Sequence, residues 1–142
     1  MHSLAYAAAV TRDGDDYVAS VRDLPQVVTA GDTEAQAWEL AADAIEVVVA
    51  TLLEREMDIP TPSPVRDGER LIALPSHLAA KVAVYQAWRH SGIRKTELAR
   101  RMGRSETEVR RILDPHHGTK IDQLDEAARA LGGRLVIQFE AA

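Results

Sequence analysis

The stretch KTELARRMGRSETEVRRILD, residues 95–114, decides the fold of the C-terminal half of this sequence. Two helices that cross through a short turn need a small residue where they touch and a glycine where the chain reverses. Ala99 meets the first need, and Gly103, four residues later, meets the second. Val109 and Ile112 follow at the spacing that anchors a second helix to a core. The stretch therefore predicts a helix-turn-helix.

The outer side of the second predicted helix carries side chains that suit a DNA groove. Ser105, with Glu108 three residues later, forms a capping box that begins this helix. Arginine reads guanine in the major groove, and small hydroxyls contact bases or phosphates. Residues 89–111 hold eight Lys/Arg against three Glu, the kind of balance that phosphate neutralisation requires. The residues that we expect to contact double-stranded DNA are Lys95, Thr96, Arg100, Arg104, Ser105, Glu106, Thr107, Arg110 and Arg111.

The segments on either side of this stretch complete an all-α domain with one terminal β-strand. Residues 76–92 predict a preceding helix, and residues 121–131 predict a closing helix. His116 and His117 lie between helices and point to opposite sides of an extended chain, so they are poorly placed to share a metal ion. Residues 134–139, RLVIQF, are typical of a strand. A lone strand leaves its edge unpaired, so we expect it to pair with a second copy, giving a dimer or a dimer of dimers.

The N-terminal half predicts a small antiparallel sheet with one long helix. Thr33 is a good N-cap for this helix, and Gln36 completes a capping box. After the helix, residues 59–64, IPTPSP, form a stiff extended connector. One more short strand follows, and we expect two domains, 1–75 and 76–142. The predicted strands are residues 4–11, 17–22, 26–30 and 69–74, and the helical stripe expected to pack on them is Trp38, Ala41, Ile45, Val48 and Leu52.

Three aspartates, Asp13, Asp15 and Asp16, surround Gly14 between the first two predicted strands. An EF-hand calcium loop needs a bidentate Glu at its twelfth position, and a two-metal nuclease needs carboxylates that converge from separate strands. One hairpin tip supplies neither, and Asp-Gly is a strong hairpin signal. We therefore expect a turn here, with no metal site and no cofactor in the chain.

Composition and charge narrow the class of protein further. The 142 residues include no cysteine, which excludes disulfides and thiolate zinc sites and fits a reducing cytoplasm. The start, MHSLAYAAAV, lacks the basic residues of a signal peptide, and no apolar run is long enough to span a membrane. Residues 1–70 hold five Lys/Arg against fourteen Asp/Glu, whereas residues 71–142 hold twelve against eight. This asymmetry predicts two surfaces for two kinds of partner, unless the charge only solvates both halves.

Short motifs occur in a fixed order along the chain: Tyr17-Val18-Ala19, Asp23-Leu24-Pro25, Ala30-Gly31-Asp32-Thr33, residues 59–63, Lys81, Tyr85, and residues 95–102, 110–115 and 124–131. In this order and spacing, the whole chain resembles the HicB antitoxins of prokaryotic toxin–antitoxin operons. The resemblance implies an N-terminal domain with a partial ribonuclease-H-like fold and no working catalytic site. It also implies a partner, the small basic HicA-type toxin that cleaves mRNA, and autorepression through promoter DNA.

We therefore expect an α+β protein that acts in the cytoplasm as a non-enzymatic antitoxin and autorepressor. Two other hypotheses stay open: a helix-turn-helix repressor whose N-terminal domain senses a small ligand, and a metal-dependent nuclease with a DNA-binding tail. For the C-terminal half, a plain helical packing unit or a helix-turn-helix that contacts protein is the alternative. The candidate toxin-binding residues, chosen because they are acidic and near loops, are Asp15, Asp16, Asp23, Asp32 and Glu34.

Overall fold

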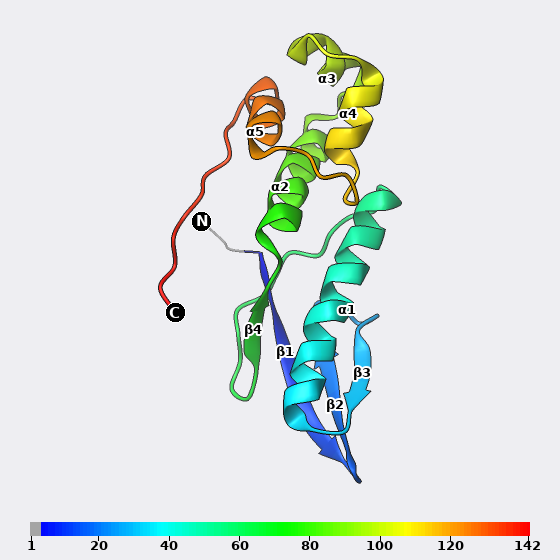
Figure 1. Ribbon diagram of the computed structural model, residues 1–142, viewed down its shortest axis with the longest axis vertical. Helices are drawn as coiled ribbons and strands as arrows, with labels where there is room; N and C mark the ends of the chain where they lie inside the picture. Colours follow the sequence, from blue (N-terminus) through cyan, green and yellow to red (C-terminus); the bar gives the residue numbers. More distant parts are fainter. Residues whose placement is uncertain (1–3) are drawn as a thin grey trace. The chain divides into compact units, whose positions relative to one another are not determined.

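The computed structural model describes residues 4–142, and the chain divides into two compact units, Met1–Pro75 (unit 1) and Ser76–Ala142 (unit 2) (Figure 1). Residues 1–3, at the start of the segment inspected for a signal peptide, lie outside the described part. Across residues 4–142, no helix is long and apolar enough to cross a membrane.

Unit 1 is a four-stranded antiparallel sheet with one long helix on its face, which confirms the predicted α+β class (Figure 1). Its elements are β1 (Ala5–Asp13), β2 (Asp16–Val21), β3 (Val28–Gly31), α1 (Glu34–Glu54) and β4 (Arg70–Ala73). The strands lie in the order β3-β2-β1-β4, so the last strand of the unit pairs with the first. Small side chains bring the sheet and the helix close together, since Ala19 of β2 packs against Ala37 and Ala41 of α1.

The connection between β1 and β2 is the predicted hairpin turn. Asp13 pairs with Asp16 across it, which leaves Gly14 and Asp15 as a two-residue loop. Gly14 has a φ of 63°, a conformation that glycine adopts without a steric cost. The three aspartates at this tip are exposed.

The start of α1 differs in one detail from the predicted capping box. Thr33 is the N-cap, and its hydroxyl accepts a hydrogen bond from the Gln36 N–H at 3.1 Å. The Gln36 side chain, however, accepts from the backbone N–H of Asp32 at 2.6 Å, one residue before the cap. The backbones come so close here that a Cβ on Gly31 would lie 2.8 Å from the nitrogen of Ala37. This close approach explains why β3 ends in glycine.

The buried face of α1 is rotated slightly from the predicted stripe. Trp38 and Val48, which were expected inside it, are only half-buried, whereas Ala37 and Val49 are buried. The other three positions of the stripe are buried as predicted. An indole is too large for the close approach between helix and sheet, and the small side chain of Ala37 faces Ala19 instead.

Unit 2 consists of four helices with a shared core. They are α2 (Ser76–Ser91), α3 (Lys95–Met102), α4 (Glu106–Leu113) and α5 (Ile121–Ala130). The side chains predicted to form the buried side of α2, Leu78, Val82, Tyr85 and Trp88, are all buried.

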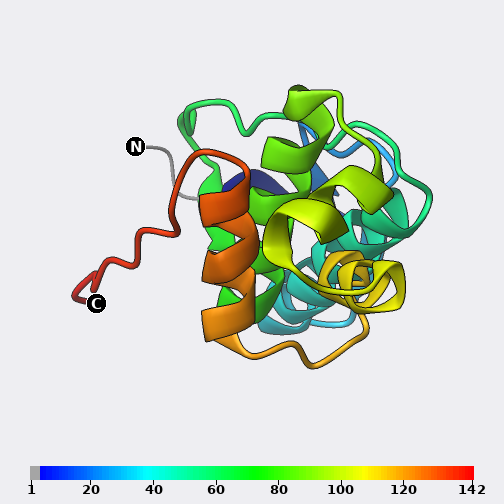
Figure 2. The ribbon, with the colours of Figure 1, turned by 90° about the horizontal axis from the view of Figure 1, so that it is seen from above.

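The predicted strand over residues 134–139 is not formed in the single chain. Residues 133–142 contain no helix or strand, and this segment extends away from the helices of unit 2 (Figure 2). A strand needs a neighbour for its backbone hydrogen bonds, and the regular elements of unit 2 are all helices. Ile137 and Phe139 are 79% and 95% exposed. The pairing of this segment with a second copy stays a prediction.

Candidate functional site

Unit 2 contains two short helices, α3 and α4, joined by a tight turn. Gly103 ends α3 in the left-handed conformation, with φ 65° and ψ 33°. Its N–H donates to the Arg100 carbonyl at 3.2 Å, and the Arg104 N–H donates to the Ala99 carbonyl at 3.0 Å. These two bonds satisfy carbonyls of the last turn of α3, so the chain reverses without leaving them unpaired.

The second helix, α4, begins with a complete capping box. The Ser105 hydroxyl accepts from the Glu108 N–H at 3.2 Å, and the Glu108 carboxylate accepts from the Ser105 N–H at 3.3 Å. Val109 and Ile112 are buried on one side of the helix, as predicted. The other side is exposed and carries Thr107, Arg110 and Arg111.

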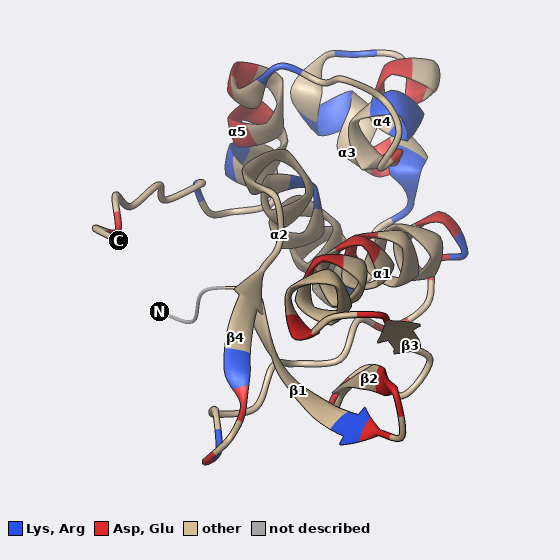
Figure 3. Ribbon diagram, turned by 60° about the horizontal axis from the view of Figure 1, so that its bottom comes forward, with Lys and Arg blue, Asp and Glu red and all other residues tan. Residues whose placement is uncertain are grey.

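Basic residues recur along α3 and α4, where their segments of the ribbon are blue (Figure 3). Several of these residues have a carboxylate partner on the same helix. Arg110 donates to Glu106 at 2.8 Å, and Arg100 donates to Glu97 at 2.6 Å. Hydrogen bonds from Arg100 and Arg101 lower the pKa of Glu97 to about 2. Exposed ion pairs of this kind are weak, so these arginines can exchange a carboxylate for a phosphate oxygen.

Arg104 has a different environment from the other predicted DNA-contacting residues. Its guanidinium pairs with Glu126 of α5 and lies 3.6 Å from the Glu108 carboxylate. The hydrogen bond to Glu126 raises the pKa of Arg104 above its usual value. Because its side chain is only 29% exposed, Arg104 ties the turn to α5 and is less available to DNA than its neighbours.

The remaining predicted DNA-contacting residues lie near the start of each helix and on the outer side of α4. Lys95 opens α3 and places its ammonium 5.6 Å from the centre of the Trp88 ring. Thr96, the next residue, is exposed. Arg111 is also exposed, and its guanidinium has no ion pair with any residue of the described chain. The predicted set therefore divides into residues on α3 and α4 and two residues of the turn, Arg104, which pairs with Glu126, and Ser105, whose hydroxyl caps α4.

The acidic candidates of unit 1 divide between the two ends of the sheet. Tyr17 pairs with Gly31, which sets the β1–β2 hairpin tip beside the loop that leads into α1. Asp23 follows β2 at the opposite end. The candidates that share the hairpin end, all exposed, are Asp15, Asp16, Asp32 and Glu34.

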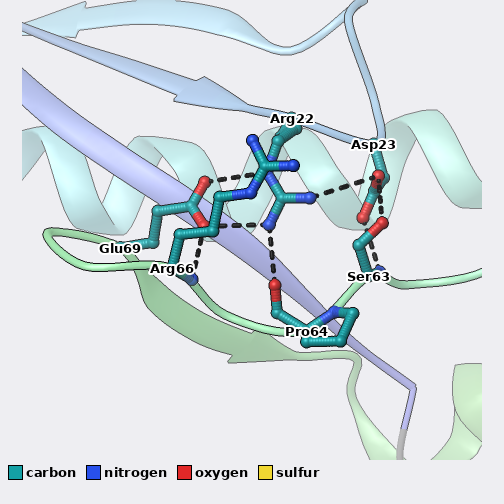
Figure 4. Close-up of polar contacts among 6 residues, drawn as sticks. All are labelled: Arg22, Asp23, Ser63, Pro64, Arg66 and Glu69. Carbon is teal, nitrogen blue, oxygen red and sulfur yellow. Dashed lines mark hydrogen bonds and ion pairs between the residues drawn. The ribbon is translucent and has the colours of Figure 1, made fainter.

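Asp23 belongs to a polar network that fastens the proline-rich connector to the sheet (Figure 4). Its carboxylate accepts from the Ser63 N–H at 2.7 Å and from the Ser63 hydroxyl at 2.8 Å. Beside it, Arg22 donates to both carboxylate oxygens of Glu69, at 2.9 and 3.1 Å, and to the Pro64 carbonyl at 2.8 Å. The hydrogen bonds from Ser63 lower the pKa of Asp23. We call these five residues the connector clasp, and they give Asp23 a structural role.

The exposed side of α1 carries a row of acidic residues that was missed in the sequence. Glu39, Asp43 and Glu46 recur at steps of four and three, and all three are exposed. Between Glu34 and Glu54 the helix contains no Lys or Arg, and its acidic segments are visible along its length (Figure 3). The helical period of these acids was the signal that could have identified them. We call Glu39, Asp43 and Glu46 the α1 acidic row.

Two histidines of unit 2, His77 and His117, contact Thr119 in the loop after α4, whereas the His90 ring lies 2.7 Å from the Gln86 carbonyl oxygen of its own helix. The His77 ring lies 3.0 Å from the Thr119 carbonyl oxygen, and the His117 ring lies 2.8 Å from the Thr119 hydroxyl oxygen. Within the part of the chain that the structure describes, no group of three His, Cys, Asp or Glu side chains is arranged to hold a metal ion.

Comparison with known proteins gives matches over most of the chain. Residues 5–83 match the family model described as the HicB_like antitoxin of bacterial toxin-antitoxin systems. The protein named Antitoxin HicB of Escherichia coli (strain K12) is 40% identical over 119 residues, which cover 84% of this chain and 86% of the relative. Antitoxin HicB 1 of Photorhabdus laumondii is 38% identical over 124 residues, 87% of this chain and 79% of the relative. Antitoxin HicB of Pseudomonas fluorescens is 33% identical over 138 residues, 96% of this chain and 94% of the relative.

Proposed function

The chain belongs to the HicB-like antitoxin family of bacterial toxin–antitoxin systems, and on this basis we propose that it is a non-enzymatic antitoxin with two binding functions. Unit 1 binds and occludes a small basic HicA-type toxin that cleaves mRNA. Unit 2 binds double-stranded DNA at the promoter of its own operon and represses it. The observation that carries the proposal is the family match, because the curated relatives align over both units.

The charge of unit 1 supports a basic protein as its partner. Its acidic side chains are concentrated at the hairpin end of the sheet and on the α1 acidic row, and most of them are exposed. Opposite charge on two proteins accelerates their encounter and selects the correct partner. We therefore assign the toxin contact to these two acidic surfaces and not to Asp23, whose carboxylate is occupied by Ser63.

The exposed side of α4 supports DNA binding by unit 2. In a helix-turn-helix, the second helix enters the major groove and the first crosses the backbone, which fits the exposed Arg110 and Arg111 on α4 and the exposed Thr96 and Arg100 on α3. Such motifs bind paired half-sites as dimers. Residues 134–139 supply the dimer contact by pairing with the same segment of a second copy.

The first experiment is to purify a tagged chain from its native host at high salt and to identify what accompanies it. We expect a small basic protein in near-stoichiometric amount. DNA fragments without such a protein would contradict the antitoxin function and favour a repressor whose first unit senses a small ligand. Once the co-purified protein has been removed, cleavage of RNA or DNA by the chain in Mg²⁺ or Mn²⁺ that Asp13→Ala or Asp16→Ala abolishes would contradict the non-enzymatic assignment.

Charge reversal then tests the toxin-binding surface. Replacing Glu39, Asp43 and Glu46 together by Lys should abolish rescue of cells from the co-purified toxin while leaving the melting temperature and promoter binding unchanged. Replacing Asp15 and Asp16 by Lys measures how much of the toxin binding depends on the hairpin end of the sheet. The matched control reverses two exposed acids of unit 2. Normal rescue by both unit 1 variants would remove these surfaces from the proposal.

A further inference from the structure

A buried lysine holds the C-terminal turn of α4. Lys81 lies on α2, where the buried neighbours on the helix are apolar or aromatic, and its relative exposure is 0%. Its ammonium donates hydrogen bonds to the carbonyls of Arg111 and Ile112, both at 2.9 Å, and to the Thr119 hydroxyl oxygen at 2.7 Å. All three donors of the ammonium are therefore used, and two of them go to carbonyls in the last turn of α4, where the Arg111 carbonyl also accepts from the Asp114 N–H at 3.2 Å.

Packing alone does not explain a lysine at this position. Burying an ammonium group carries a desolvation cost, and an apolar side chain of similar length fills a core without that cost. What only the ammonium supplies is a positive charge and three donors at the negative end of the α4 dipole. The arrangement therefore favours a defined geometry of this turn over maximal stability of the core.

The loop that follows α4 is part of the same arrangement. Thr119 is 3% exposed, and its hydroxyl oxygen lies 3.3 Å from the Arg111 carbonyl oxygen as well as 2.7 Å from the Lys81 ammonium. His77 of α2 contacts the Thr119 carbonyl oxygen. The loop is thus folded back on the last turn of α4 and fastened to α2 at two points.

We propose that Lys81 is a positioning residue for DNA recognition: its three hydrogen bonds fix the orientation of α4 before DNA arrives. The proposal rests on the DNA-binding function assigned to α4 above. Arg110 and Arg111 lie in the turn that Lys81 holds, so a displacement of this turn moves both guanidinium groups. An α4 that becomes ordered only on binding loses affinity by the cost of that ordering.

The protonation of Lys81 gives this role a measurable signature. Burial lowers the pKa of Lys81 to about 8, against an opposing effect of Asp114. His77 and His117 are the other titratable side chains at this site. A neutral amine offers only two donors, so as the pH rises through this value the network loses one hydrogen bond. Either Lys81 gives up one of its three contacts, or the Thr119 hydroxyl turns to donate to the amine and gives up the Arg111 carbonyl.

The stability of the folded chain should change with pH in the opposite direction to DNA affinity. The pKa of Lys81 is lower in the folded chain than in the unfolded chain, where lysine titrates near 10.4. The unfolded chain therefore binds more protons between these two values, and through this group the folded state gains stability as the pH rises across that range. A loss of DNA affinity over the same range reports the position of α4 and not melting of unit 2.

The test measures binding of the full chain to a labelled duplex that covers the region upstream of its own gene, with an unrelated duplex as reference. Lys81→Met keeps the length of the side chain and removes the donors. We expect it to weaken promoter binding on the order of tenfold or more and to remove the pH dependence above 8. Arg111→Ala should reduce the slope of log affinity against log salt by about one phosphate contact, whereas Lys81→Met should leave this slope unchanged because Lys81 is buried.

Chemical restoration provides a second measurement. The chain contains no cysteine, so Lys81→Cys gives a single thiol that can be alkylated with 2-bromoethylamine in denaturant before refolding. This restores an ammonium at nearly the same position and should restore binding. The sulfur lowers the intrinsic pKa of the new amine, so the pH at which affinity falls should move down. Wild-type chain carried through the same cycle is the control.

The outcomes separate the two proposals. Failure of the wild-type chain to prefer the promoter duplex overturns the proposed function itself. Normal promoter binding by folded Lys81→Met, with the wild-type pH profile, overturns the role of Lys81 and leaves DNA binding intact. If Lys81→Met does not fold, Thr119→Val is the substitute, because it removes one of the three acceptors of the Lys81 ammonium. This variant should weaken promoter binding by a smaller factor. Unchanged promoter binding by folded Thr119→Val would also overturn the role of Lys81.

Discussion

The connector clasp makes a quantitative prediction about the stability of unit 1. The Asp23 carboxylate is 15% exposed and accepts two hydrogen bonds from Ser63, at 2.7 and 2.8 Å. Each hydrogen bond to a charged group contributes about 1.5–3 kcal/mol. The two hydrogen bonds share one partner, Ser63, so their contributions do not simply add. We therefore expect Asp23→Ala to lower the free energy of unfolding of unit 1 by about 2 kcal/mol.

Urea unfolding followed by tryptophan fluorescence measures this loss. Trp38 lies in unit 1 and Trp88 in unit 2, so a Trp88→Phe background reports unit 1 alone. Asp15→Ala, at the exposed hairpin tip, is the matched control and should change stability by less than about 0.5 kcal/mol. Equal unfolding midpoints for the Asp23→Ala and Asp15→Ala variants would refute the reasoning.

Acid provides an independent check on the same carboxylate. The pKa of Asp23 is lower in the folded chain than in the unfolded chain, because Ser63 donates to the charged form. Its stabilising contribution is therefore complete above the ordinary aspartate pKa of about 3.9 and is lost as the pH falls through the folded value. The stability difference between wild type and Asp23→Ala should narrow on acidification, and a difference that stays constant would show that Asp23 acts through something other than its charge.

Three further predictions concern unit 2. Arg110→Ala combined with Arg111→Ala should abolish promoter binding in a mobility-shift assay and leave toxin neutralisation intact, and loss of both functions in a folded protein would contradict the division between units. Gly103→Ala should lower the melting temperature of unit 2 by about 4–8 °C, because a left-handed conformation costs an L-residue about 1 kcal/mol. Gly118→Ala, with equally open space for a Cβ but no positive φ, should melt like the wild type, and equal effects of both would refute the conformational explanation. Removing residues 134–142 should convert the dimer to a monomer in sedimentation and weaken promoter binding. A truncated chain that still sediments as a dimer would place the dimer contact elsewhere.

Local rules predicted the parts of the fold that depend on few residues. Gly103 and the capping box of Ser105 were identified because a left-handed turn and an N-cap each require particular side chains at a fixed spacing. The hairpin at Gly14 was predicted for the same reason. At the start of α1 the rule was nearly sufficient, since Thr33 caps the helix but the Gln36 side chain binds one residue earlier than the capping box specifies.

Long-range contacts account for what the sequence did not predict. The acidic character of Asp23 suggested a partner protein, and only the tertiary structure brings Ser63 to its carboxylate. Arg104 was expected to face DNA, and its pairing with Glu126 depends on how α5 packs. A pattern of apolar spacing identifies the buried side of α2 but gives no reason for Lys81 within it, because the acceptors for its ammonium come from another helix and a loop.

The pairing of the last strand of unit 1 with the first has a consequence for synthesis of the chain. Ala5 pairs with Ala73, and the Leu74 N–H donates to the Leu4 carbonyl, so this edge of the sheet closes only when nearly the whole unit has been made. Non-local strand pairing of this kind is slow because the intervening chain must first be ordered. Until β4 arrives, the apolar strand β1 has one unpaired edge that can join another chain. A nascent chain interrupted in the proline-rich connector therefore still has this edge open to aggregation, and completion of β4 closes it.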